Sequence, residues 1–135
     1  MKLNDIRGRP ISIDVSHKNY PPKNQHRSNR QGYCLDLIRE VYPRDIIIEE
    51  FTIPGSRMSL DFFIPSRRLA IEIQGEQHQG HINFFHGDRR YSKSYGNQKI
   101  RDSQKSYWCE NNEIRLVEIY PCDIDVEVKR KIKDG

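Results

Sequence analysis

The fold is decided by residues 58–74, which read MSLDFFIPSRRLAIEIQ. Two apolar runs, Met58–Ile64 and Leu69–Gln74, flank Pro65-Ser66-Arg67, a combination of residues typical of turns. In the second run every other residue from Leu69 is branched and apolar, so a strand here points its alternate side chains to opposite faces. The segment therefore predicts two antiparallel strands joined by a short turn.

A third apolar run, Ile46–Phe51, precedes this pair, and Pro54-Gly55-Ser56 separates it from the second strand. The three runs together predict an antiparallel meander. Upstream of the meander, a helix is predicted between a capping residue, Ser28 or Asn29, and Pro43. Its inward side chains recur at spacings of three and four: Tyr33, Leu37, Ile38 and Val41.

Downstream of the meander, a second helix is expected from about Asn97 to Asn111, followed by a strand at Glu113–Tyr120 and a short charged helix at Ile124–Lys133. The inward residues expected on the second helix are Ile100, Tyr107 and Trp108, and we interpret the two aromatic ones as core packing rather than base stacking. We expect an α/β or α+β fold in which a central mixed sheet of about four strands is flanked by helices.

The chain has 135 residues, which is the size of one domain. Residues 1–27 contain Pro10, Pro21 and Pro22 and show no sustained hydrophobic period. We therefore predict a basic N-terminal arm over residues 1–27, with at most one short strand at Ile11–Val15 and no contribution to the core. Residues 28–135 are expected to form a single domain.

Positive charge gathers in two places, although the whole chain carries only +4. Residues 1–30 hold seven basic side chains against two acidic ones, and residues 81–105 hold six against two, with aromatic residues between them. This pattern suits phosphate contacts and base stacking, whereas a merely solvated surface is the alternative. The basic residues expected to contact nucleic acid are Arg27, Arg30, Arg89, Arg90, Lys93, Lys99, Arg101 and Lys105.

Several protein classes are disfavoured by the same sequence. No window is apolar enough for a membrane span, and the first residues lack the apolar run of a secretory signal. The three cysteines, Cys34, Cys109 and Cys122, form no CxxC pair and do not indicate a disulfide framework. We expect a cytoplasmic protein that acts without a membrane, in the host cytoplasm if a phage encodes it.

Two carboxylates stand out because they interrupt apolar strands. Asp61 lies beside Leu60 and Phe62, and Glu72 lies in the next strand of the meander. A buried carboxylate is costly unless it finds a cation or a hydrogen-bond donor. Facing side chains of neighbouring strands lie about 5 Å apart, so the two acids could share a divalent metal. Gln74 follows on the same face as Glu72 and offers an amide to a metal, a water or a phosphate.

Two other interpretations of these residues stay open. The acids could instead form buried ion pairs with Arg57, Arg67 or Arg68. The segment Gly75-Glu76-Gln77-His78 could bring a histidine close to the acids, where it could relay a proton or bind metal. A zinc site is less favoured, because the candidate ligands His78, His81, His86 and Cys109 lack a paired motif.

Four segments in order carry a resemblance to a known superfamily: LDFFIP at residues 60–65, LAIEIQGEQH at 69–78, RDSQK at 101–105 and NNEIRLVEIY at 111–120. Together they resemble the PD-(D/E)XK nucleases, and within these the branch of very-short-patch-repair and phage homing endonucleases. The resemblance covers about residues 30–122. It implies a restriction-endonuclease-like fold and a metal-dependent DNA endonuclease that uses Mg²⁺, for which Mn²⁺ may substitute.

The resemblance also implies roles for individual residues. Asp61 and Glu72 match the acidic pair, which would hold the metal together with a strand carbonyl, that of Ile73. Gln74 stands where the superfamily has lysine and this branch often has aspartate. Three further catalytic positions are matched by His78, by Asp102 at the following helix, and by Glu50, or its neighbour Glu49, in the preceding strand. Gln31 occurs in the helix where relatives often carry glutamate.

Three functional hypotheses follow. The first is an endonuclease that nicks DNA or cuts both strands, encoded by a phage or a mobile element. The second is a non-catalytic nucleic-acid-binding protein on the same fold, which Gln74 favours because glutamine carries neither a charge nor a transferable proton. The third is a nuclease subunit that obtains its specificity from a partner, either a second copy in a homodimer or a larger phage or mobile-element complex.

Overall fold

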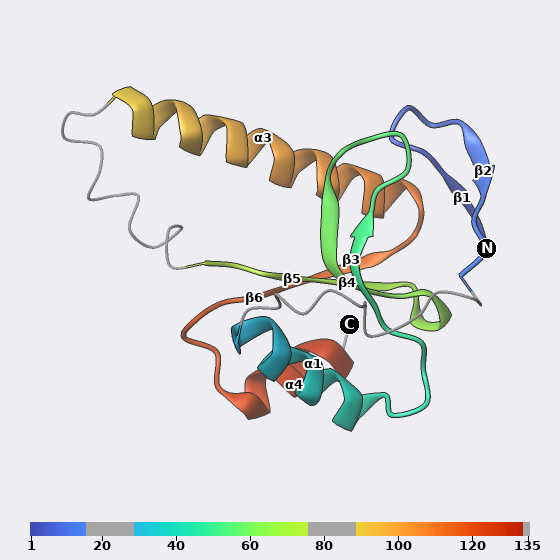
Figure 1. The fold of residues 1–135 in the computed structure, drawn as a ribbon, viewed down its shortest axis with the longest axis vertical. Helices are drawn as coiled ribbons and strands as arrows, with labels where there is room; N and C mark the ends of the chain where they lie inside the picture. Colours follow the sequence, from blue (N-terminus) through green and yellow to red (C-terminus); the bar gives the residue numbers. More distant parts are fainter. Residues whose placement is uncertain (16–28, 76–88, 134–135) are drawn as a thin grey trace.

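The protein has an α+β fold built on a mixed four-stranded sheet and a smaller two-stranded one (Figure 1). The computed structural model describes residues 1–15, 29–75 and 89–133, and of residues 89–99 it describes only the backbone. The elements in chain order are β1 (Lys2–Asn4), β2 (Pro10–Ser12), α1 (Asn29–Val41), β3 (Ile48–Thr52), β4 (Ser59–Ile64), η1 (Pro65–Arg67), β5 (Leu69–Ile73), α3 (Arg89–Asn111), β6 (Arg115–Ile119) and α4 (Asp125–Lys133).

The larger sheet has the strand order β3-β4-β5-β6. The first three strands pair antiparallel, which confirms the predicted meander, and the 3-10 turn η1 occupies the expected Pro65-Ser66-Arg67. Strand β6 then pairs parallel to β5, with Leu69 opposite Arg115 and Ile73 opposite Ile119. A parallel neighbour requires a long crossover, and the connection that contains α3 provides it.

Helices cover both faces of this sheet, as the nearly edge-on view of Figure 1 shows. Helices α1 and α4 pack on one face, around Ile38, Phe62, Ile71 and Ile132. Helix α3 and the two-stranded sheet cover the other face, around Leu3, Phe63, Ala70 and Trp108. Strand β5 lies between the two layers, so its alternate side chains enter different cores. All of its residues are buried except Ile73, which is half-buried.

The alternation of β4 is interrupted at Asp61. Leu60 and Phe63 pack in the same core on the α3 face, whereas Phe62 packs on the α1 face. An uninterrupted strand would place Leu60 and Phe62 on one face. The disturbance extends to β3, where Glu50 lies opposite Asp61 between the paired residues and has a left-handed backbone with φ 51°. A deviation at one residue re-aims the side chains around it, as a β-bulge does.

Residues 1–15 do not form the extended arm that the sequence predicts. Strands β1 and β2 make an antiparallel hairpin, and Leu3 belongs to the core on the α3 face. The indole Nε1 of Trp108 donates a hydrogen bond to the Asn4 carbonyl at 2.7 Å, and the Asn4 amide donates to Asn112 Oδ1 at 2.7 Å. The short strand expected at Ile11–Val15 overlaps β2, whereas β1 was not expected, because three residues are too few for a hydrophobic period.

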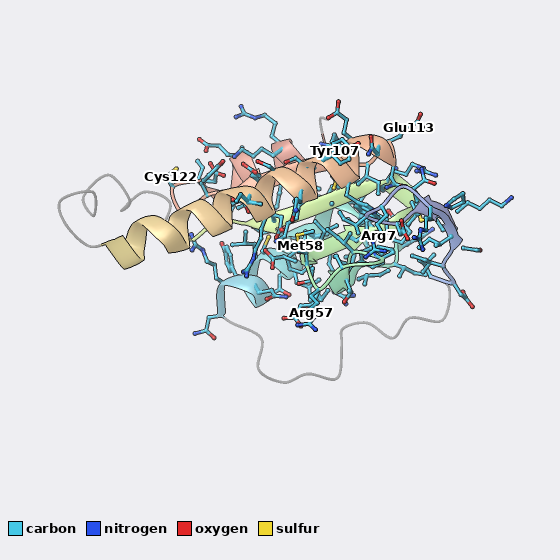
Figure 2. All side chains as sticks on the ribbon, turned by 90° about the horizontal axis from the view of Figure 1, so that it is seen from above. Arg7, Arg57, Met58, Tyr107, Glu113 and Cys122 are labelled. Carbon is cyan, nitrogen blue, oxygen red and sulfur yellow. The ribbon has the colours of Figure 1, made fainter. Side chains whose placement is uncertain are left out.

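Helix α1 confirms the predicted helix, but two helices differ in which side chains they bury. Tyr33 of α1 is 55% exposed, and on α3 the expected inward residues Ile100 and Tyr107 are 58% and 61% exposed. Figure 2 labels Tyr107 beside α3. Trp108 is buried, which confirms its interpretation as core packing. Helix α3 also begins at Arg89, earlier than expected. Among the described residues, no helix is both long and apolar enough to cross a membrane.

Candidate active site between strands β4 and β5

Asp61 and Glu72 meet where β4 and β5 separate. The backbone ladder between the two strands runs from Ile64 opposite Leu69 to Phe62 opposite Ile71, and the next facing pair is Asp61 and Glu72. Here side chains replace the backbone ladder: the Ile73 amide donates to Asp61 Oδ2 at 2.7 Å, and the Asp61 amide donates to Glu72 Oε2 at 3.3 Å. The two predicted carboxylates are therefore brought together by bonds that each makes to the other's strand.

The acid pair is poorly solvated. Glu72 is 7% exposed, and Asp61 is half-buried. Burial, together with the hydrogen bond and the negative charge of Asp61, raises the pKa of Glu72 to about 8 against the lowering effect of Lys105. A carboxyl group held this far from its ordinary pKa is common at functional sites, although structural ion pairs also produce such shifts.

Lys105 supplies the cation of this cluster. Its Nζ lies 2.6 Å from Glu72 Oε1, and its side chain, which comes from α3, is 20% exposed. The sequence analysis predicts a phosphate contact for Lys105 and names arginines as partners for the acids. Two of those arginines are engaged elsewhere: Arg67 pairs with Asp45 at 2.9 Å, and Arg68 donates to the Asn112 carbonyl at 2.6 Å.

Gln74 shares the α3 face of the sheet with Glu72 and is 7% exposed. Its backbone amide donates to the Ile119 carbonyl at 2.8 Å, which continues the ladder between β5 and β6 one residue past β5. The glutamine is thus held beside the acid pair by the strand that carries Glu72. Gln74 is uncharged. Within the described part of the chain, the positive group that touches the acids is therefore the ammonium of Lys105.

Of the two glutamates in β3, the structure turns Glu50 toward solvent and buries Glu49, which is 4% exposed. Gln31 Nε2 of α1 donates to Glu49 Oε1 at 3.4 Å. Asp61 lies toward the same helix. The pKa of Cys34 in α1 is raised to about 12, mainly by burial, and the negative charge of Asp61 adds to this effect. Glu49 is therefore the buried glutamate of β3, whereas Glu50 combines exposure with a left-handed backbone, and a catalytic role for either one stays a prediction.

The structure describes the other predicted positions only in part. His78 and Arg27 lie outside the described residues, as do the zinc candidates His81 and His86. The side chains of Arg89, Arg90, Lys93 and Lys99 are likewise not described, although their backbone lies in α3. Arg30 and Arg101 are exposed. Asp102 is half-buried and lies near the end of β6. The hydrogen bond that Tyr120 donates to Glu118 is the main reason that the pKa of Tyr120 is raised to about 12, and the negative charge of Asp102 contributes to the same shift.

The sequence missed a third acid beside the pair. Glu118 of β6 is the register partner of Glu72 in the parallel ladder, and it accepts a hydrogen bond from the Tyr120 hydroxyl at 2.5 Å. A parallel register between distant segments leaves no local signal, so only the alternation of Leu116, Glu118 and Tyr120 hinted at the face that they share.

The donor set of the acid pair suits a small, hard cation. Two carboxylates face each other, and the Ile73 carbonyl points to the same edge of β5 as its amide, which is the edge that carries Asp61. Mg²⁺ is commonly held by one or two carboxylates and completes its shell with waters and phosphate oxygens. Within the described residues, no group of three or more histidine, cysteine or acidic side chains could hold a metal ion. The fit therefore rests on two carboxylates, a carbonyl and water.

Comparisons with known proteins point to viruses. The chain is 34% identical to "Uncharacterized protein 033L" of Invertebrate iridescent virus 3 over 125 residues, which is 82% of this chain and 62% of that protein. It is 31% identical to "Uncharacterized protein 307L" of Invertebrate iridescent virus 6 over 62 residues, which is 46% of this chain and 30% of that protein. The chain thus spans less than two thirds of the length of these relatives. No protein-family model and no solved structure matches it.

Proposed function

We propose that the protein is a metal-dependent DNA endonuclease that hydrolyses phosphodiester bonds at an active site between β4 and β5. The observation that carries this proposal is the pairing of two poorly solvated carboxylates, Asp61 and Glu72, at the point where two central strands separate. Two such acids side by side are unfavourable for the fold, because the negative charge of Asp61 raises the cost of ionising Glu72. A cation between them removes that cost.

In this proposal Asp61, Glu72 and the Ile73 carbonyl hold Mg²⁺, for which Mn²⁺ can substitute. The metal supplies an activated water and stabilises the charge that develops on the phosphate. The chain's own residues orient the site: the Ile73 amide holds Asp61 Oδ2, and the Asp61 amide holds Glu72 Oε2. Lys105 lies close enough to neutralise phosphate charge, which glutamine at position 74 cannot do.

DNA is the proposed substrate because basic residues lie around the acids. Arg101 is exposed one helical turn before Lys105 on α3, and Arg30 is exposed at the start of α1. Contacts of this kind bind the backbone of a nucleic acid without reading its sequence. The restriction-endonuclease-like resemblance of the four sequence segments supports the same substrate, and the viral relatives support an origin in a virus or mobile element.

Cleavage of supercoiled plasmid tests the proposal directly. The purified chain should produce nicked or linear DNA with Mg²⁺ or Mn²⁺ and none with EDTA. Asp61→Asn keeps the shape of the side chain and an oxygen for the Ile73 amide, and it should lower the rate by about a hundredfold to ten-thousandfold, because the metal supplies several kcal/mol of transition-state stabilisation.

Asp45→Asn is the matched control, since it removes the same charge from the surface pair with Arg67. It should leave the rate unchanged. Cleavage that survives both Asp61→Asn and Glu72→Gln would show that the acid pair is not the active site.

A non-catalytic nucleic-acid-binding protein is the second candidate. It is favoured by the uncharged, buried Gln74 and by the ion pair that already balances Glu72. This candidate predicts salt-dependent DNA binding with no metal-dependent product, and binding that Asp61→Asn leaves unaltered. A subunit that depends on a partner is supported by the greater length of the viral relatives. It predicts that plasmid cleavage appears only when that partner is added.

A further inference from the structure

The ammonium of Lys105 occupies the acid pair in a way that bears on metal loading. It lies 2.6 Å from Glu72 Oε1, while Glu72 Oε2 accepts from the Asp61 amide at 3.3 Å. Both oxygens of this carboxylate therefore already accept hydrogen bonds. Each oxygen keeps a second lone pair, but a divalent cation that binds Glu72 there lies close to one of these donors.

The ammonium is the donor that can leave. The Asp61 amide is fixed in strand β4, whereas Lys105 reaches the carboxylate through a flexible four-carbon chain. Its side chain is 20% exposed, so the charge lies between the buried acids and the solvent. A cation arriving at Glu72 also meets the repulsion of the ammonium, so that metal and lysine compete for one carboxylate.

A phosphate can take over the ammonium. Lys105 lies one turn after the exposed Arg101 on α3, and both side chains are suited to contacts with phosphate oxygens. An anionic backbone lying along this part of α3 would offer Lys105 a new partner outside the acid pair. Glu72 would then lose its counter-ion, and the metal would no longer meet the repulsion of the ammonium.

We propose that Lys105 couples the two ligands, so that DNA binding releases Glu72 for the metal and the metal releases Lys105 for DNA. This inference rests on the proposed function, because it uses the same acid pair as the metal site. Coupling between two ligands is reciprocal, so each must raise the affinity of the other by the same factor. With this coupling, the metal binds mainly when DNA is bound, and Lys105 neutralises Glu72 when DNA is absent.

Titration of Mn²⁺, followed by electron paramagnetic resonance, tests the coupling without measuring cleavage. The titration is done with and without a short DNA duplex made with phosphorothioate linkages, and the duplex alone is titrated to subtract its own Mn²⁺ binding. The variants are Lys105→Met and Lys105→Gln, and circular dichroism checks that they fold. Lys129→Met is the matched control, since Lys129 makes an ion pair of the same length, 2.6 Å, with the exposed Glu40.

In the wild type and in Lys129→Met, DNA should tighten Mn²⁺ binding by about tenfold, which lies within the usual range of coupling between sites. Lys105→Met and Lys105→Gln should bind Mn²⁺ about tenfold more tightly without DNA, and DNA should then add little. The DNA affinity measured with and without Mn²⁺ should show the same factors.

Two results would overturn the inference, and they differ from the failure of the proposed function. If both Lys105 variants bind Mn²⁺ no more tightly than the wild type, the ammonium does not compete with the metal. If DNA still tightens Mn²⁺ binding to the Lys105 variants by the wild-type factor, the coupling does not run through this lysine. If no folded variant binds Mn²⁺ under any condition, the acid pair is not a metal site and the proposed function itself falls.

Discussion

Replacing Glu72 by glutamine should change how stability depends on pH in the absence of metal. The pKa of Glu72 rises from its ordinary 4.5 to about 8 in the folded chain, chiefly through burial and then through Asp61. Between these pH values the unfolded chain has released the proton that the folded chain retains. The unfolded state then binds fewer protons, so the free energy of unfolding falls as the pH rises. The contribution of Glu72 is fully favourable below pH 4.5 and is lost by about pH 8.

The size of this effect follows from the shift. Each pH unit inside the window costs about 1.4 kcal/mol when one proton separates the two states. Between pH 5 and pH 7 the wild type should therefore lose about 2–3 kcal/mol more stability than Glu72→Gln, which has no proton to release. The two proteins should be closest in behaviour at low pH, where Glu72 of the wild type is itself neutral.

Urea unfolding in EDTA across this pH range measures the difference. Glu40→Gln is the matched control: it removes the same group from an ion pair of the same length with Lys129, but the Glu40 side chain is 58% exposed. Its curve should run parallel to that of the wild type. If the Glu72→Gln curve also runs parallel, burial does not raise the pKa of Glu72 as described. The proposal that the acid pair binds a metal then loses its electrostatic support.

Three further predictions follow from the same structure. Leu3→Ala should lower the free energy of unfolding by about 2–5 kcal/mol, because Leu3 is 4% exposed and lies in the core beside α3, and urea unfolding measures the loss. Glu49→Gln should slow plasmid cleavage and Glu50→Gln should not, because Glu49 is buried toward α1 and Glu50 faces solvent; equal rates for the two variants would refute the assignment. A thiol reagent at pH 8 should label the native protein at the exposed Cys122 alone, because burial raises the pKa of the other two thiols to about 12 and shields them; three labelled cysteines by mass spectrometry would contradict this.

The meander and the acids within it could be predicted from sequence because their signals are local. Apolar runs, turn residues and the alternation after Leu69 are properties of a few consecutive residues. The same alternation was enough to place Glu72 and Gln74 together on one face, and the antiparallel meander was enough to bring Asp61 close to Glu72. The interruption at Asp61 was not predictable, because it depends on how Glu50 meets the neighbouring strand.

Partners that are distant in sequence escaped prediction. The pairing of Lys105 with Glu72 joins a helix to a strand 33 residues away. The packing of Leu3 near Trp108 and the register of Glu72 with Glu118 likewise depend on where separate elements come to rest. The prediction that both Tyr107 and Trp108 face inward was wrong for Tyr107 for the same reason. The two residues are adjacent, and the position of α3 on the sheet determines which of them is buried.

The α+β class, the succession of the main strands along the chain and the carboxylates that interrupt them could all be predicted from the sequence. These are set by side-chain periodicity and turn chemistry, which act over a few residues. The folded structure was needed to show which cation balances Glu72, which β3 glutamate is buried, and that the N-terminal hairpin completes a core. These outcomes depend on distances between atoms from remote segments, because an ion pair or a buried contact gains its energy only when folding brings both partners together and excludes water.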